Sequence, residues 1–349
     1  MKITLHKVTL NKRFPLAISR GVHYNSENLF VRFEKDGIFG WGEAAPGKTE
    51  GAGTISQVKQ SIEKFISEGI EGQSIQKLYD RSRQLNVPPC AYVGLDTAFW
   101  DWTSKKAGMP LYQMLGFSKP FRPTSITIGI NTPEVVKERV PILLEGTTVK
   151  SLKIKLGSPE GIEADKSMFE QVVESTRKYN VKIRVDANGG WNLSDAKKMM
   201  PWLAERGVDY IEQPLKEGEE GYLKELFKNR ALPIYVDESC RYSEDIPSFA
   251  EHVDGVNMKL MKCGGITEAL RIIGTARAYK LKTMIGCMSE SSVSIAAAAS
   301  LTGGIDHIDL DSHYNLSPDP AMGAPLINGI TLPQEIPGHG AELKKEFYA

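Results

Sequence analysis

Eight short β-rich segments alternate with helical segments between residues 124 and 310, and this repeat leaves the chain few folds to adopt. The strand-like segments are residues 125–130, 151–156, 182–186, 209–213, 233–237, 255–260, 283–287 and 305–310. We expect seven intervening helices, among them amphipathic stretches at 164–179, 194–206, 219–228 and 267–279. Strands that alternate with helices of this length build parallel sheets from βαβ units. Eight units predict an α/β fold closed into a barrel, with an open doubly wound sheet as the alternative.

The segment before this repeat has a different pattern. Strands are predicted up to about residue 45, with Asp36-Gly37 marking a hairpin turn, and helical periodicity follows. A chain of 349 residues is long enough for two domains. We therefore expect an α+β domain over residues 1–120 and the barrel over residues 121–325.

The charge balance gives no sign of a nucleic-acid or membrane partner. The 43 Lys and Arg residues match 43 Asp and Glu residues, so the formal net charge is zero. We expect no signal peptide from the first residues, and the apolar stretch near residues 295–301 is far short of the ~18 residues that span a bilayer. The four cysteines form no Cys-x-x-Cys pair, which predicts reduced thiols in a cytoplasmic protein: Cys90, Cys240, Cys263 and Cys287.

Three consecutive predicted strands end in carboxylates, Asp186, Glu212 and Asp237. Because the C-terminal ends of barrel strands meet on one face, these three side chains should crowd together. Like charges at such distances repel unless a cation lies among them. All-oxygen ligands favour a hard cation, Mg²⁺ before Mn²⁺ or Ca²⁺. The alternative is that acidic residues simply end these strands in solvated loops.

Lysines on two other strands are predicted to point into the barrel. Lys153 and Lys155 share one face of their strand by the period of two, and Lys259 shares a face with Asn257 on the sixth strand. Strands two and six lie opposite each other in a ring of eight, so Lys155 and Lys259 would reach the site from two sides. Two opposed bases suit racemisation or epimerisation at an α-carbon. The alternative is that the lysines lie on the surface of misassigned strands.

Taken together, these motifs resemble the enolase superfamily, and within it the muconate-lactonizing-enzyme subgroup. The resemblance runs through residues 40–44, 95–101, 108–111, 153–155, 186–188, 212–214, 237–239 and 259–265. It implies a (β/α)7β barrel, a modified TIM barrel with an α+β capping domain to which residues 326–349 return. It also implies the following roles: Mg²⁺ ligands Asp186, Glu212 and Asp237; acid/base groups Lys155 and Lys259; a substrate-carboxylate contact at Lys153; and outer supporting residues Asn188 and Glu238.

The predicted eighth strand separates the reactions of this subgroup. Asp309 and Asp311 share a face by the period of two, and a pair of carboxylates suits a substrate ammonium group. The pair resembles the Asp-x-Asp motif of dipeptide epimerases, which implies epimerisation at the C-terminal residue of a dipeptide. L-Ala-D/L-Glu from peptidoglycan turnover is the first expected substrate, and hydrophobic or cationic dipeptides remain open. The alternatives are an N-acylamino-acid racemase, an o-succinylbenzoate synthase, and, outside the class, a non-catalytic binding barrel.

Two further residues are candidate substrate contacts. Arg20 lies between the first two predicted strands, where a loop of the cap would close over the site, and it would suit a glutamate side chain. Glu290 follows the seventh barrel strand and would either face the substrate or cap the next helix. A surface position is the alternative for Arg20. Members of the resembled family are often oligomers, so a homo-oligomer is open as well.

Overall fold

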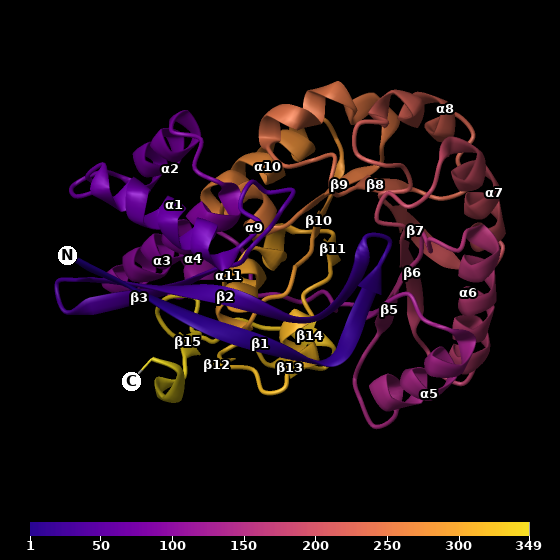
Figure 1. The fold of residues 1–349 in the computed structure, drawn as a ribbon, viewed down its shortest axis with the longest axis horizontal. Coiled ribbons are helices and arrows are strands. Elements are labelled where there is room, and N and C mark those ends of the chain that lie inside the picture. The colour runs from indigo at the N-terminus through magenta and orange to yellow at the C-terminus, as the bar shows by residue number, and fades with distance from the viewer. Residues whose placement is uncertain (349) are drawn as a thin grey trace.

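A three-stranded antiparallel sheet and a ring of eight parallel strands organise the computed structural model, which describes residues 1–348 (Figure 1). The small sheet has the order β1-β2-β3, and four helices follow it. Its elements are β1 (Lys2–Ile18), β2 (Gly21–Lys35), β3 (Ile38–Ala44), α1 (Ile55–Ser67), α2 (Ile75–Gln84), α3 (Pro89–Ala107) and α4 (Leu111–Met114). This α+β unit, with its sheet and helices, is called the cap below.

Helix α3 lies directly on strand β3, and two glycines make this approach fit. A Cβ atom at Gly40 would lie 2.2 Å from the Ala98 carbonyl oxygen, and one at Gly42 would lie 2.0 Å from the Gly94 carbonyl oxygen. No side chain fits at such distances from backbone atoms. The glycines of the segment 40–44 therefore serve the packing of the cap.

The eight parallel strands form one sheet in chain order, from β4 to β11. Their bounds are β4 (Ile126–Ile128), β5 (Ser151–Lys155), β6 (Lys182–Asp186), β7 (Val208–Glu212), β8 (Ile234–Val236), β9 (Gly255–Met258), β10 (Lys282–Ile285) and β11 (His307–Ile308). A parallel bridge between Thr124 and Ile308 joins the two ends of the sheet, with Ser125 N donating to Ile308 O at 3.1 Å. The sheet is thus a closed barrel, which excludes the open doubly wound alternative.

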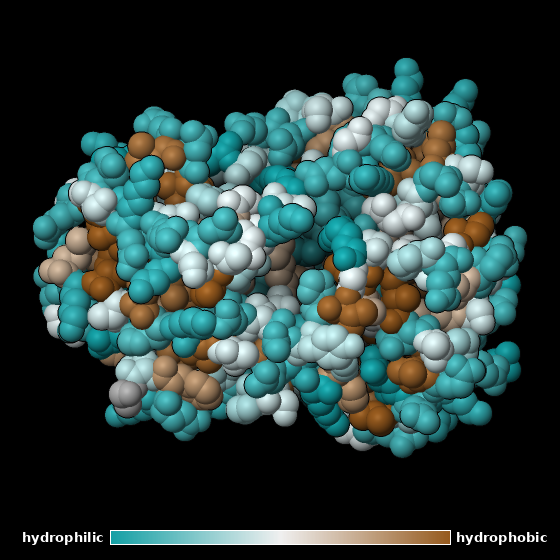
Figure 2. Space-filling model, viewed as in Figure 1, coloured by the Kyte–Doolittle hydropathy of each residue, from teal (hydrophilic) through white to brown (hydrophobic). Residues whose placement is uncertain are grey.

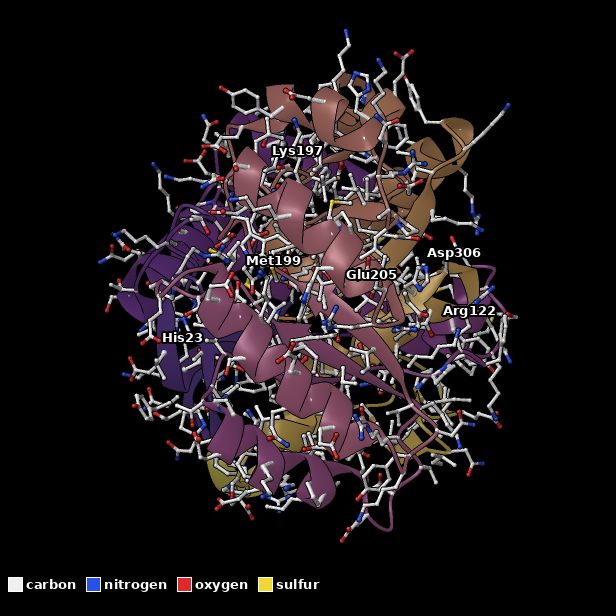
Figure 3. All side chains as sticks on the ribbon, turned by 90° about the vertical axis from the view of Figure 1, so that its right-hand side faces the viewer. His23, Arg122, Lys197, Met199, Glu205 and Asp306 are labelled. Atoms are coloured by element: carbon white, nitrogen blue, oxygen red, sulfur yellow. The ribbon has the colours of Figure 1, made fainter. Side chains whose placement is uncertain are left out.

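Helices cover the outside of the barrel: α5 (Pro133–Leu144), α6 (Ile162–Thr176), α7 (Leu193–Ala204), α8 (Leu223–Phe227), α9 (Leu260–Cys263), α10 (Ile266–Ala278) and α11 (Ser292–Ala299). On α7, Met199 is buried, whereas Lys197 and the C-cap residue Glu205 are exposed; Figure 3 labels all three. None of the helices described within residues 1–348 has the length and apolarity needed to span a bilayer.

One connection differs from the expected repeat. Seven helical connections were expected between the eight strands. Between β8 and β9 the chain instead forms two 3-10 turns, Ser243–Ser248 and Ala250–His252. Pro247 lies inside the first turn. Proline lacks the backbone N–H that an α-helix needs and its ring clashes with the preceding turn, so this segment stops short of a regular helix.

The β1–β2 hairpin reaches from the cap across the C-terminal ends of the barrel strands (Figure 1). Ile130 N, just after β4, donates to Ala17 O at 2.8 Å, and Ser19 Oγ donates to Asn188 O at 2.9 Å. Figure 3 shows His23 of the hairpin at one edge of the barrel and Arg122 and Asp306, which precede β4 and β11, at the other. Figure 2 shows the surface hollowed between the two halves of the molecule.

The last residues lie against the cap. Trp41 O accepts a hydrogen bond from His339 Nε2 at 2.9 Å, and the Tyr348 ring lies 5.2 Å from the Trp41 ring. The same C-terminal region forms two short antiparallel strand pairs: β12 (Ala321–Met322) with β15 (Glu342–Leu343), and β13 (Leu326–Ile327) with β14 (Ile330–Thr331). Domain boundaries at residues 120 and 325 stay a prediction.

Two buried carboxylates of the cap hold the N-termini of two barrel helices. Glu43 accepts hydrogen bonds from Ser291 N and Oγ at the start of α11, at 3.1 and 2.6 Å. Asp96 accepts from Thr267 N and Oγ1 at the start of α10, at 3.1 and 2.5 Å. Burial raises the pKa of Glu43 and of Asp96 to about 7 each.

These pKa values predict a pH-dependent stability. The folded state binds protons more tightly than the unfolded state, so the contribution of each group is complete below its ordinary pKa and is lost as the pH rises toward 7. Each group lowers the unfolding free energy by up to about 1.4 kcal/mol per pH unit in that window. The free energy of unfolding can be measured with denaturant at several pH values between 5 and 8. It should fall less steeply with rising pH in Glu43→Gln and in Asp96→Asn than in the parent chain. The exposed Glu63, changed to Gln, is the control, and equal slopes in all four proteins would contradict the prediction.

Candidate active site

The three predicted metal ligands meet at the C-terminal ends of neighbouring strands. Asp186 ends β6, Glu212 ends β7 and Asp237 directly follows β8. One carboxylate oxygen of each lies within 4.8 Å of those of the other two, and all three side chains are buried. The apolar residues of each strand turn outward to the helices, and the alternation places these carboxylates inside.

Each carboxylate has a lysine ammonium group beside it. Lys155 Nζ lies 2.5 Å from Asp186 Oδ2, Lys153 Nζ lies 2.7 Å from Glu212 Oε2, and Lys259 Nζ lies 2.6 Å from Asp237 Oδ2. All three lysines point into the barrel, as the period-two alternation predicts. β5 and β9 are the second and sixth of the eight strands, so Lys155 and Lys259 approach from opposite sides.

The donor set fits a hard cation. Burial and the neighbouring Asp186 carboxylate raise the pKa of Glu212 to about 8, whereas Lys155 and Lys153 outweigh burial and lower the pKa of Asp186 to about 2. Among the described residues, Glu212 Oε2 accepts no hydrogen bond of good geometry, although Lys153 is near. Three buried carboxylates with all-oxygen donors suit a hard cation such as Mg²⁺.

Two more residues complete this cluster, and neither was assigned a role from the sequence. Asn257 Nδ2 donates to Glu212 Oε1 at 2.7 Å, and Lys262 Nζ donates to Asp237 Oδ1 at 2.7 Å. Asn257 could have been recognised from its inward position two residues before Lys259. Lys262 could not have been recognised in this way. It faces the site because β9 ends at Met258 and the short helix α9 follows.

The predicted ammonium-binding pair lies beside this cluster. Asp309 Oδ2 is 2.7 Å from Lys153 Nζ, and its Oδ1 accepts a hydrogen bond from Ser125 Oγ at 2.6 Å. Asp311 Oδ2 accepts from Thr127 N at 2.6 Å, and its Oδ1 has the Cys287 thiol at 3.8 Å. Burial and the Asp309 charge raise the pKa of Asp311 to about 6. Both carboxylates are on the inner face, as predicted, and Asp311 Oδ1 is the more available acceptor.

Among the outer candidates of the site, Arg20 contacts both Glu238 and Asn188. Arg20 Nη2 lies 2.6 Å from Glu238 Oε1, and its Nη1 donates to Asn188 O at 3.0 Å, so the hairpin is fastened to the loops after β8 and β6. Asn188 in turn donates to Asp186 through its backbone N at 2.8 Å.

Glu290 serves its own loop. Its Oε1 accepts from Met288 N at 2.7 Å, and its Oε2 accepts from Ser294 Oγ in the first turn of α11 at 2.6 Å. The side chain is buried. Ser291, rather than Glu290, caps α11, so Glu290 orders the loop before the helix and stays a candidate substrate contact.

A barrel mouth with three buried carboxylates between two facing lysines, under an α+β cap, defines an enzyme of the enolase superfamily. The family model "Mandelate racemase / muconate lactonizing enzyme, N-terminal domain" matches residues 1–116, and the model "Enolase C-terminal domain-like" matches residues 136–347. The chain belongs to this family.

Its relatives include enzymes that are named for their substrates. A hydrophobic dipeptide epimerase of Flavobacteria bacterium (strain MS024-2A) is 78% identical over 349 residues, which cover all of both chains. A hydrophobic dipeptide epimerase of Roseobacter litoralis is 57% identical over 98% of this chain and 99% of its own. The solved structure of the Enterococcus faecalis dipeptide epimerase with Mg and L-Leu-L-Tyr is 31% identical, with a TM-score of 0.90 over 97% of this chain and 98% of that chain.

Proposed function

We propose that this chain is a Mg²⁺-dependent dipeptide epimerase that inverts the α-carbon of the C-terminal residue, with hydrophobic dipeptides as its first substrates. The observation that carries the proposal is that Asp309 lies beside Lys153, which also contacts Glu212 of the carboxylate cluster. With Asp311 two residues further along the chain, this arrangement supports a site for a free ammonium group near the acid/base lysines.

Lys155 and Lys259 carry out the proton transfer. One lysine, as a neutral amine, removes the α-proton from one face of the substrate, and the other, as an ammonium ion, returns a proton to the opposite face. After one turnover the two lysines have exchanged protonation states, and the next substrate of the opposite configuration restores them. When bound by Asp186, Glu212 and Asp237, Mg²⁺ supplies positive charge that stabilises negative charge on the substrate carboxylate.

Lys153 and the aspartate pair orient the substrate. The Lys153 ammonium group is held between Glu212 and Asp309. It therefore lies between the part of the site that would take the substrate carboxylate and the part that would take the substrate ammonium group. Asp311 Oδ1 and Asp309 offer charge-assisted acceptors for the substrate's N-terminus. N-acyl amino acids and succinylbenzoate have no ammonium group to use them.

The side-chain preference follows from the relatives and from Arg20. The relatives at 78% and 57% identity are named hydrophobic dipeptide epimerases, and L-Ala-D/L-Glu epimerases occur among those near 31%. Arg20 is paired with Glu238 and is therefore less available to a substrate glutamate. Hydrophobic dipeptides come first on this reasoning, and L-Ala-D/L-Glu, as formed in peptidoglycan turnover, comes second.

A dipeptide library tests the proposal. In D₂O with Mg²⁺, dipeptides with a free N-terminus should exchange their C-terminal α-proton, and their N-acetylated forms should not. Replacing Asp311 or Asp309 by Asn should lower kcat/KM by about 10- to 150-fold, since a hydrogen bond to a charged group contributes about 1.5–3 kcal/mol. The exposed Asp36, changed to Asn, is the matched control.

Other outcomes would support the alternatives. Turnover of an N-acyl amino acid or of an o-succinylbenzoate precursor without any dipeptide exchange would favour the racemase or synthase. No exchange and no dependence on Mg²⁺ would favour a non-catalytic barrel.

We propose that the enzyme acts in the cytoplasm, without nucleic-acid or membrane partners, and that it forms a homo-oligomer. The zero net charge supports the absence of such partners, and the four free cysteines support a reducing compartment. Sedimentation at micromolar concentration measures the oligomeric state.

A further inference from the structure

The three carboxylates share a pattern in how their oxygens are used. Each has an inner oxygen beside a lysine of the cavity and an outer oxygen that accepts a hydrogen bond from the surrounding protein. The inner oxygens are Asp186 Oδ2, Glu212 Oε2 and Asp237 Oδ2. The outer oxygens are Asp186 Oδ1, Glu212 Oε1 and Asp237 Oδ1, and their donors are Asn188 N, Asn257 Nδ2 and Lys262 Nζ.

Lys262 is fully committed to this arrangement. Its ammonium group donates to Asp237 Oδ1 at 2.7 Å, to Asn257 O at 2.8 Å and to Asp237 O. Three acceptors use all three of its N–H groups, and the side chain is only 1% exposed. Lys262 therefore has no donor left for a substrate, and its contacts fix both the backbone and the side chain of Asp237.

Asn257 holds Glu212 in the same way. It is fully buried on β9, and its Nδ2 donates to Glu212 Oε1 at 2.7 Å. Asp186 receives its outer bond from the backbone N–H of Asn188, which a change of the Asn188 side chain to another with a backbone N–H leaves in place.

We propose that Asn257 and Lys262 are positioning residues that leave Glu212 and Asp237 one oxygen each for the cation, and that they thereby make the site select Mg²⁺ over Ca²⁺. Mg²⁺ takes six ligands in a tight octahedron, and single oxygens on one side of the ion suit it. Ca²⁺ takes six to eight oxygens and gains from carboxylates that bind through both oxygens. The outer donors prevent that second mode. This inference rests on the proposed function, because it assumes that the three carboxylates hold the cation.

Calorimetric titration of the full chain with MgCl₂ and with CaCl₂ tests the proposal through binding alone. Lys262→Met removes the donor at Asp237, and Asn257→Leu removes the donor at Glu212 with a side chain of similar size. Loss of the Lys262 charge raises the affinity for both divalent cations alike, so the ratio of the two Kd values isolates the geometry. We expect that ratio to shift toward Ca²⁺ by about tenfold in each variant. The exposed Lys228, changed to Met, should leave it unchanged.

The outcomes separate the two proposals. A parent chain that binds Mg²⁺, with the same Mg²⁺-to-Ca²⁺ ratio in Lys262→Met and Asn257→Leu, would overturn this inference and leave the proposed function standing. A parent chain that binds no Mg²⁺ would overturn both. If Lys262→Met does not fold, Asn257→Leu decides alone, because it keeps every buried charge paired.

Discussion

Replacing Lys155 by alanine should lower kcat for epimerisation by about 10²- to 10⁴-fold, and Lys259→Ala should do the same, because each variant lacks the acid/base group on one face of the substrate. The two variants should differ in which epimer still exchanges its α-proton. Lys155→Ala keeps Lys259, which can still remove the α-proton that faces it and return a deuteron to the same face. One epimer of a dipeptide should therefore exchange in D₂O without inversion, and Lys259→Ala should act on the other epimer. Proton NMR of each pure epimer measures this.

Lys105 is a suitable control for these variants. It forms an ion pair with Asp101 of the cap at 2.8 Å and lies far along the chain from the cluster. Lys105→Ala should leave exchange of both epimers intact. Equal exchange of both epimers in Lys155→Ala would mean that one base serves both faces.

The second large effect concerns stability as well as activity. Asp237→Asn should abolish turnover and should also destabilise the fold by about 3–5 kcal/mol, because Lys259 and Lys262 would lose the charge that compensates them in a buried place. Removing the cation with EDTA should abolish turnover while the chain stays folded. The four buried lysines then balance the charge of the carboxylates. The chain loses only the stabilisation that cation binding gave the folded state, about 2.7 kcal/mol when the cation concentration is 100-fold above Kd.

Urea unfolding with and without EDTA, for the parent chain and Asp237→Asn, measures both effects. Glu251, which is exposed, is the matched site for a carboxylate-to-amide change as Glu251→Gln. A chain that unfolds when EDTA is added would show that the lysines do not compensate the carboxylates.

Much of this site could be predicted because barrel strands follow a strict period. Two lysines two residues apart must share a face, and three carboxylates at equal steps along the repeat must share an end. The class of fold and the shared face of Asp309 and Asp311 follow from the same rule. These features depend only on the alternation of side chains along a strand and on the spacing of the repeat, both of which can be read from the sequence.

The remainder depends on contacts between distant segments or on where an element stops. The contact of Lys262 with Asp237 requires β9 to end at Met258, and one residue more of strand would turn Lys262 away. The partner of Arg20 is Glu238, 218 positions along the chain. Glu290 turns back to its own loop because Ser294 follows at helical spacing. The absence of an α-helix between β8 and β9 is consistent with Pro247 in that segment, a signal that the expected strand–helix repeat did not take into account.

The contact of Tyr348 and His339 with Trp41 has a consequence for the order of synthesis. The ribosome delivers the chain from its N-terminus, so the cap sheet emerges before the residues that complete the packing around Trp41. The whole barrel is made in between. The cap therefore gains its last contacts at Trp41 only after the barrel has been synthesised.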